Sequence, residues 1–173
     1  PLPYSIKAQI GLDKNEDQGR NVIARLKVNE ASSNEAVMVG GHIDHLGFGN
    51  RGGTRAKGEQ ASKMHLGADD NASGVAGMLE LAKRFDSQSS GHSMLFAAFS
   101  GEEKGLWGSN QFCETPTINL DSVRYMINFD MVGRLRGDTL AVYGTGTSPG
   151  WMELLESCNE DSLILVPSES GVG

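Results

Sequence analysis

Apolar residues along this chain gather in short runs that end abruptly at polar residues. Segments rich in β-branched and aromatic residues, bounded by turn-forming residues, predict a series of strands. These strands are expected at residues 4–10, 22–28, 36–40, 93–99, 123–129, 139–143 and 163–166. The runs AVMVGG, MLFAAF and YMINF are apolar at nearly every position. Such runs are typical of strands that are covered on both faces, as in a parallel-rich sheet.

Three stretches between these runs have helical patterns. In ASGVAGMLELAKRF, apolar residues recur every three or four positions and form one stripe. The stripe consists of Val75, Met78, Leu79 and Ala82. EKGLWGSNQFCE is a shorter and weaker pattern, and SPGWMELLESCNE begins with Ser148 as the expected N-cap and Pro149 at the first helical position. The alternation of strands and helices predicts an α/β fold with three layers.

Length and charge narrow the function classes. A chain of 173 residues suits one domain with a hydrophobic core. The net charge is −7 and no basic cluster occurs, which excludes a nucleic-acid-binding domain. No apolar run reaches about 18 residues, so no segment is predicted to span a membrane. Cys113 and Cys158 lack partners at metal-ligand spacing and are expected to be buried thiols, with a disulfide left open.

Side chains that can bind metals follow three of the apolar runs. His42, Asp44 and His45 come after AVMVGG, Glu102 and Glu103 come after MLFAAFSG, and Asp130 comes after YMINF. A fourth acidic group, which includes Asp70, stands just before the longest helix. In open α/β sheets, ligand sites lie at the carboxyl ends of the strands. The sequence therefore predicts one polar site at this edge of the sheet.

Each of these residues also has a purely structural interpretation. His42 could be a polar strand end that is satisfied by hydrogen bonds. Asp70 could cap the helix that begins near Ser73. Glu102 and Glu103 could be first-turn acids that the helix dipole stabilises. All of these interpretations would have to hold on one edge of one sheet, which favours a functional site instead.

The chemistry of these residue types points to divalent metal ions. Histidine and carboxylates together suit zinc and similar ions, and a carboxylate shared by two ions makes a hydrolytic two-metal site. In an extended segment His42 and Asp44 point to one face, so Asp44 is expected to hold the far ring nitrogen of His42. Adjacent side chains diverge, so Glu103 is expected to bind a metal while Glu102 faces the water as general base.

Four motifs in order resemble peptidase family M28, the di-zinc aminopeptidases. They are GGHIDHLG, GADDNASGVAGMLELA, FAAFSGEEKGLWGS and NFDMVGR, and together they cover roughly residues 20 to 135. The resemblance implies a zinc-exopeptidase fold, with a mixed, mostly parallel central sheet in one catalytic domain over residues 1–173. It implies a metal-dependent aminopeptidase that hydrolyses N-terminal peptide bonds through a di-zinc-bound water, with peptides that have a free N-terminus as substrates.

The resemblance also implies roles for individual residues. His42 and Asp130 would bind the first Zn²⁺, Glu103 would bind the second, and Asp70 would bridge both. Glu102 would be the catalytic base, and the peptide bond between Asp70 and Asn71 would be cis. An exported location, periplasmic or extracellular, rests on the resemblance alone.

One departure from the family pattern concerns the last ligand. Relatives supply a histidine from a Ser-Asp-His stretch, and this sequence stops at VPSESGVG, about where that stretch should begin. The expectation is therefore a catalytic domain incomplete at both ends, with two zinc ions in a complete site and one or two here. On spacing His45 and His92 do not replace the ligand, and His65 is the remaining substitute. Self-association through an exposed sheet edge is a further hypothesis.

Two rival functions use the same fold. The first is a glutaminyl-cyclase-like acyltransferase with a single zinc, against which the DDNASG pattern and the pair His42–Asp44 argue. The second is a non-catalytic binding module. Such a module would have no need of a base at Glu102, so the presence of this residue favours the enzyme.

Overall fold

The computed structural model describes residues 6–7, 18–26, 30–49, 53–86 and 90–171. The chain divides into two compact units, Pro1–Gly133 and Arg134–Gly173, and each is described by itself. The helices and strands of the first unit are β1 (Ile6–Lys7), β2 (Val22–Leu26), β3 (Glu30–His42), α1 (Gly74–Phe85), β4 (Ser90–Phe99), α2 (Trp107–Glu114) and β5 (Val123–Asn128). Its short helical turns are Gly58–Ser62, Ala68–Ser73, Glu102–Lys104 and Leu120–Ser122.

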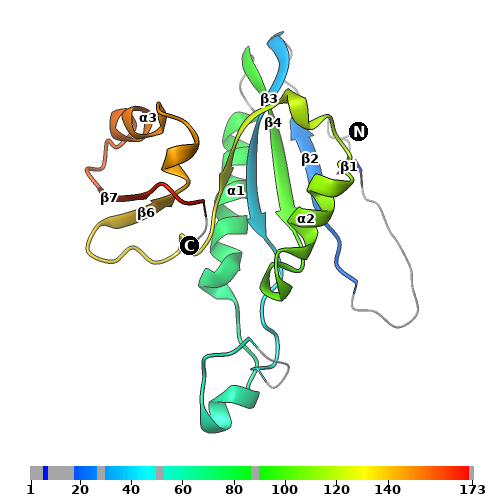
Figure 1. The fold of residues 1–173 in the computed structure, drawn as a ribbon, viewed down its shortest axis with the longest axis vertical. Coiled ribbons are helices and arrows are strands. Elements are labelled where there is room, and N and C mark those ends of the chain that lie inside the picture. The colour runs from blue at the N-terminus through cyan, green and yellow to red at the C-terminus, as the bar shows by residue number, and fades with distance from the viewer. Residues whose placement is uncertain (1–5, 8–17, 27–29, 50–52, 87–89, 172–173) are drawn as a thin grey trace. The chain divides into compact units, whose positions relative to one another are not determined.

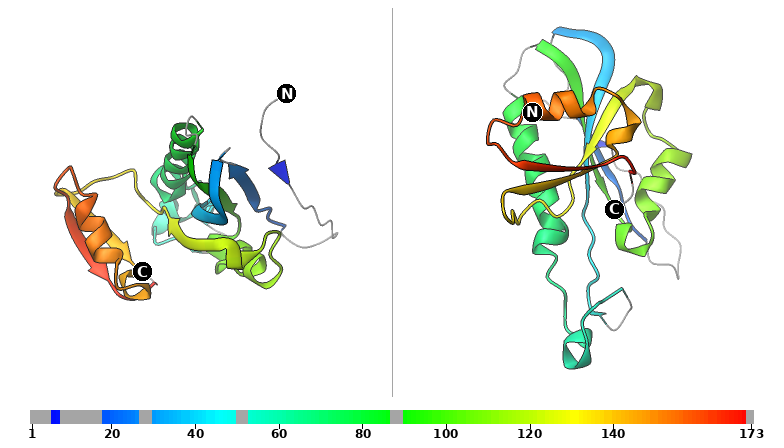
Figure 2. Two further views of the ribbon diagram at one scale, coloured as in Figure 1. Left: turned by 90° about the horizontal axis from the view of Figure 1, so that it is seen from above. Right: turned by 60° about the vertical axis from the view of Figure 1, so that its left-hand side comes forward.

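A five-stranded mixed sheet forms the centre of the first unit. The strand order is β1-β2-β4-β3-β5, with β3 parallel to both β4 and β5. The strand β2 runs antiparallel to β4 and to β1. Helices α1 and α2 lie on opposite faces of this sheet (Figures 1 and 2). The predicted α/β fold with three layers and a mixed sheet is confirmed.

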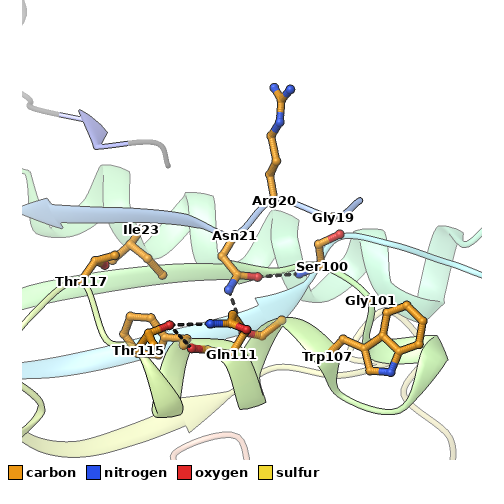
Figure 3. Close-up of a pocket in the computed structure, with 12 residues that line it drawn as sticks. Gly19, Arg20, Asn21, Ile23, Ser100, Gly101, Trp107, Gln111, Thr115 and Thr117 are labelled. Atoms are coloured by element: carbon orange, nitrogen blue, oxygen red, sulfur yellow. Dashed lines mark hydrogen bonds between the residues drawn. The ribbon is translucent and has the colours of Figure 1, made fainter. Parts of the chain in front are cut away.

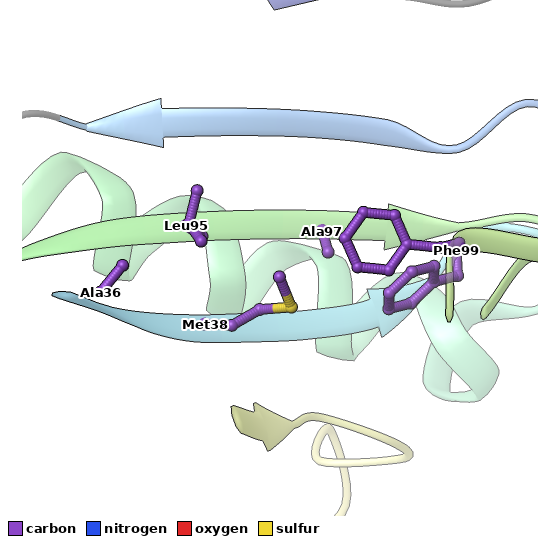
Figure 4. Packing of buried hydrophobic residues seen from close by; sticks show 6 residues of the cluster. Ala36, Met38, Leu95, Ala97 and Phe99 are labelled. Carbon is purple, nitrogen blue, oxygen red and sulfur yellow. The ribbon is translucent and has the colours of Figure 1, made fainter. Parts of the chain in front are cut away.

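The runs AVMVGG and MLFAAF form strands that are buried on both faces, as predicted. The prediction is wrong for YMINF, because Tyr125, Met126 and Ile127 of β5 are 40–42% exposed. On the face toward α2, Met38 and Leu95 pack with Phe99 and with Phe112 of α2 (Figure 4). The two phenylalanine ring centroids are 5.7 Å apart. On the other face, a second cluster contains Val39 and residues of α1. Successive strand residues point to opposite faces, so both faces require apolar side chains.

The inward stripe of α1 differs from the predicted one at Leu79, Leu81 and Phe85. Met78 is buried, but Leu79 is 61% exposed. Leu81 and Phe85 pack against the core cluster instead. The side of the helix that carries Met78 and Phe85 therefore faces the sheet, and Leu79 faces solvent.

The second unit contains two parallel strands and a helix. These are β6 (Thr139–Tyr143), α3 (Trp151–Ser157) and β7 (Ile164–Ser168), with a short helical turn at Thr145–Thr147. The predicted cap of α3 is wrong, because the helix begins at Trp151 and its N-cap is Gly150. Pro149 therefore precedes the helix rather than starting it.

Three other expectations concern the cysteines, membrane-spanning segments and self-association. Cys113 and Cys158 are free and exposed, so the prediction of buried thiols is wrong. Cys113 follows Phe112, which takes the inward position on α2. Across the described ranges, the structure has no helix that is both long enough and apolar enough to span a membrane. Self-association through a sheet edge stays a prediction.

Candidate metal centre

The carboxyl ends of three parallel strands meet at one edge of the central sheet. In the β3–β4 ladder His42 pairs with Phe99, and in the β3–β5 ladder Gly40 pairs with Asn128. The chain segments that follow these positions therefore leave the sheet side by side. The structure thus brings the predicted residues of all three strand ends to one edge, where the segment before α1 also lies.

A first group of ligand atoms surrounds the ring of His42, which is only 3% exposed. Its Nε2 atom lies 3.1 Å from Oδ1 of Asp70 and 3.6 Å from Oδ1 of Asp130. The three ligand atoms lie within 4.8 Å of one another. Neighbouring ligands of a tetrahedral zinc ion are separated by roughly 3.3 Å, given metal–ligand bonds of about 2.0–2.1 Å. The group therefore fits one zinc ion.

A second group shares Asp70 with the first. Nδ1 of His45 lies 2.7 Å from Oε1 of Glu103 and 3.9 Å from Oδ2 of Asp70. Asp70 therefore turns Oδ1 toward His42 and Oδ2 toward His45. A carboxylate with one oxygen in each of two ligand groups has the geometry of a bridging ligand.

Three polar atoms of the two groups are buried without hydrogen bonds. Nε2 of His42, Nδ1 of His45 and Oε1 of Glu103 are inaccessible to solvent and have no partner of hydrogen-bonding geometry within the described part of the chain. Buried polar atoms normally have such partners. The two groups also place three carboxylates against two imidazoles, a negative excess that divalent cations offset. The residues present therefore fit zinc ions in donor type and in charge.

Asp44 contacts both the ring of His42 and the turn that follows β4. Nδ1 of His42 lies 3.0 Å from the backbone oxygen of Asp44, while the Asp44 carboxylate is 3.8 Å away. That carboxylate instead accepts hydrogen bonds from the backbone amides of Glu102 (3.1 Å) and Glu103 (3.2 Å). The backbone oxygen of Asp44 is thus the nearer partner of the imidazole, and the expectation that the carboxylate holds the far ring nitrogen stays a prediction. Asp44 fixes the turn that presents both glutamates.

Glu102 lies beside the first group without belonging to it. One of its carboxylate oxygens is 3.9 Å from Nε2 of His42. Burial raises the pKa of Glu102, His42 opposes this rise, and the carboxylates of Glu103 and Asp130 add to it. A bound cation would lower this pKa again. Glu102 is thus a carboxylate that is close to the ligand groups and free of them.

Asn71 is a positioning residue, a role that the sequence analysis did not predict. Its peptide bond to Asp70 is cis, as expected, and its side chain is buried. The amide Nδ2 donates to the backbone oxygen of Phe129 at 2.8 Å. Oδ1 accepts from the amides of Gly74 (3.0 Å) and Met131 (3.3 Å). The side chain therefore ties together the two segments that carry the carboxylates of the first group.

A glycine allows this close packing. A Cβ atom at position 74 would lie only 2.4 Å from the backbone oxygen of Phe129 and 2.4 Å from Oδ1 of Asn71. The helix α1 can therefore approach the segment after β5 only with glycine at this position.

Replacing Asn71 by alanine is expected to destabilise the first unit. The change leaves one backbone oxygen and two amides without their partner, and each buried unpaired group costs about 1–3 kcal/mol. We expect the free energy of unfolding to fall by at least about 2 kcal/mol, measured by urea unfolding. The exposed Asn110→Ala is the matched control, with an expected change within about 0.5 kcal/mol. Equal midpoints for the two variants would contradict the positioning role.

The other histidines do not join these groups in the described structure. His65, the expected substitute ligand, packs edge-on against His45 with ring centroids 6.1 Å apart, and neither ligand group includes it. His92 is exposed near the start of β4. The residue that sequence analysis set aside, His45, is the one beside Glu103. The position of His45, three residues after His42, was the sequence feature that could have indicated its place beside the candidate ligands.

A separate pocket of about 460 Å³ contains none of the candidate ligands. It lies between the start of β2, Ser100 and α2 (Figure 3). The side chain of Asn21 forms one wall of the pocket. Its Nδ2 donates to the backbone oxygen of Gly108 at 2.7 Å, and its Oδ1 accepts from the backbone amide of Ser100 at 3.0 Å. Arg20 points away from the pocket in Figure 3. The polar lining therefore attaches α2 to the strand ends, and the candidate metal ligands lie elsewhere.

Comparison with known sequences identifies a family. The sequence model of peptidase family M28 matches residues 21–164. A probable zinc metalloprotease from Pyrenophora tritici-repentis is 34% identical over 117 residues, which are 68% of this chain and 25% of that protein. A probable lipoprotein aminopeptidase, LpqL, from Mycobacterium tuberculosis is 34% identical over 117 residues, 66% of this chain and 20% of that protein. The matched part of the chain spans a fifth to a quarter of the length of these relatives.

Solved structures show the same fold. A Zn-dependent exopeptidase from Parabacteroides distasonis superposes with a TM-score of 0.76 and 18% identity, covering 96% of this chain and 63% of that one. A glutaminyl cyclase from Porphyromonas gingivalis gives a TM-score of 0.74 and 19% identity, covering 95% and 62%. The fold is therefore that of the zinc exopeptidases, as predicted, and proteins of two chemistries share it.

Proposed function

The chain belongs to peptidase family M28, and we propose that it carries the active centre of a zinc-dependent aminopeptidase with two zinc ions. The observation that carries the proposal is the position of Asp70, whose two carboxylate oxygens face two separate ligand groups. The family match spans both compact units, which supports one catalytic domain.

The roles of the ligands follow from the two groups. His42 and Asp130 would hold the first ion, Glu103 would hold the second, and Asp70 would bridge them. When bound, such a pair of ions lowers the pKa of a water and polarises the carbonyl of the scissile bond. Asp44, through its hydrogen bonds to the amides after β4, keeps Glu103 in place.

Glu102 would act as the general base. It stands beside the ligand groups but in neither of them, so its carboxylate is available to take a proton from the attacking water. The same carboxyl would then give the proton to the departing amine of the cleaved bond. Its backbone amide is held by Asp44, which fixes the direction from which it approaches.

The rival functions are less well supported by these positions. A single-zinc acyltransferase of the glutaminyl-cyclase kind would need only one ligand group, whereas Asp70 serves two. A binding module that uses metal only for structure would have no task for the carboxylate of Glu102. Both observations favour the hydrolase.

The substrates would be peptides with a free N-terminus, and the name of the mycobacterial relative, a probable lipoprotein aminopeptidase, supports this class. An exported location is part of the proposal, and the lipoprotein name of the mycobacterial relative supports it.

A paired-peptide assay tests the proposed activity. The zinc-loaded chain is incubated with a short peptide in two forms, with a free and with an acetylated N-terminus. We expect stepwise release of N-terminal residues from the free peptide alone, loss of activity with a chelator and recovery with zinc. Cleavage of the acetylated form, cyclisation of N-terminal glutamine without hydrolysis, or an inert zinc-loaded chain would contradict the proposal.

A further inference from the structure

We propose that His45 binds the second zinc ion directly through Nδ1, as the third protein ligand beside Asp70 and Glu103. This inference rests on the proposed two-ion site and adds a ligand to it. The three side chains supply one ligand atom each, and these atoms lie within 4.8 Å of one another. Their side chains are only partly exposed, at 20% for His45, 34% for Asp70 and 16% for Glu103.

The distances agree with a shared ion. The separations of His45 Nδ1 from Glu103 and from Asp70 are 2.7 and 3.9 Å. They lie on either side of the roughly 3.3 Å expected between neighbouring ligands of tetrahedral zinc. The separations in the group around His42, 3.1 and 3.6 Å, lie on either side of the same value. The two groups therefore resemble each other in spacing and in donor type.

A simple hydrogen bond explains the contact less well. Although His45 Nδ1 and Glu103 Oε1 are 2.7 Å apart, neither atom has a partner of hydrogen-bonding geometry in the described residues. A donating ring N–H would point almost straight at its acceptor. Two buried atoms that are close but not aligned for a hydrogen bond are instead consistent with two ligand atoms that both point at one metal ion between them.

The local backbone brings His45 to this place. After β3 the chain stays attached to the end of β4, because the amide of Ile43 donates to the oxygen of Phe99 at 2.8 Å. Gly67 makes room for the His45 side chain. A Cβ atom at position 67 would lie 2.9 Å from Cβ of His45 and 3.0 Å from the backbone oxygen of Asp70. Gly67 has φ +65°, a conformation that glycine adopts without strain.

The inference has a consequence for the architecture of the site. His45, Asp70 and Glu103 all belong to the first compact unit. Three protein ligands with a remaining open position are the usual coordination of catalytic zinc. The second ion would thus be bound by residues of the first unit and keep a position for water or substrate.

Zinc binding by three single variants tests the role of His45. Stoichiometry and affinity are measured by elemental analysis and by competition with a chromogenic chelator. We expect two ions in the unmodified chain. In His45→Ala the affinity for the second ion should fall on the order of a hundredfold or more, since even outer partners of ligands cost about 10–100-fold. One ion should remain at unchanged affinity, which also shows that the variant is folded.

Two histidines serve as controls for this experiment. His65→Ala removes the ring that packs against His45, and His92→Ala removes an exposed ring near the start of β4. Both variants are expected to keep two ions. Loss of the second ion in His65→Ala but not in His45→Ala would overturn the assignment in favour of His65.

A spectroscopic measurement separates a ligand from a positioning residue. With isotope-labelled imidazoles and NMR-active cadmium in place of zinc, scalar coupling between metal and nitrogen is expected on Nδ1 of His45. Weakened binding in His45→Ala without this coupling would overturn direct ligation. Two ions of unchanged affinity in His45→Ala would overturn the inference and leave the proposed function intact, whereas one ion in the unmodified chain would overturn both.

Discussion

Replacing Glu102 by glutamine is expected to lower the turnover number by about 10²–10⁴-fold, the usual contribution of a general base. Both zinc ions should stay bound. Glutamine has nearly the same shape as glutamate, but its amide cannot take a proton from water. The hydrogen bond from residue 102 to Asp44 uses the backbone amide and is unaffected by the change. The loss of activity would therefore reflect the missing base alone.

The control for this prediction is Glu114→Gln at the exposed end of α2. It should have the turnover number and zinc content of the unmodified chain. Kinetics on a peptide with a free N-terminus and elemental analysis are measured on the same samples. A turnover number for Glu102→Gln within threefold of the control would refute the assignment of Glu102 as the base.

Replacing Asp70 by alanine is expected to release both ions. Its two oxygens lie 3.1 Å from Nε2 of His42 and 3.9 Å from Nδ1 of His45, so one substitution removes a ligand from each group. We expect each zinc affinity to fall on the order of a hundredfold or more, because a direct ligand matters at least as much as an outer partner. Hydrolysis should be lost with the ions.

The matched control is Asp86→Ala, which removes an exposed aspartate just after α1. Its zinc affinities should be unchanged. Dialysis against a zinc buffer followed by elemental analysis distinguishes the outcomes. Retention of one tightly bound ion in Asp70→Ala would show that Asp70 serves a single site, which is incompatible with a bridging role.

The adjacent acids Glu102 and Glu103 illustrate what the sequence can predict. Two neighbouring carboxylates at the end of an apolar strand repel unless a cation is close. In the structure they diverge, with Glu103 beside His45 and Glu102 beside His42. Their divergence was predictable because adjacent side chains point in different directions, as they also do in the short helical turn Glu102–Lys104.

The buried strands were also predictable from local pattern. The run around Val39 and the run around Leu95 are apolar at nearly every position, and both residues are almost fully buried. A strand that is covered on both faces leaves no room for polar residues. The pattern therefore determined both the strands and the layers that cover them.

The sequence analysis was incomplete where contacts between residues far apart in the chain determine the orientation of a helix or the partners of a side chain. Leu79 fits an apolar stripe on α1, yet the sheet contacts the side of the helix that carries Phe85. The carboxylate of Asp44 binds amides 58 and 59 residues away, which no local spacing indicates. His45 meets Glu103 in the same way, through the parallel alignment of β3 and β4.

Anomalous X-ray diffraction from zinc-loaded crystals tests the two-ion site most directly. Data collected at the zinc absorption edge should give two peaks in each chain. One peak is expected between His42, Asp70 and Asp130, and the other between Asp70, Glu103 and His45. A single peak, or peaks away from Asp70, would contradict the central claim that this carboxylate joins two zinc ions in one catalytic centre.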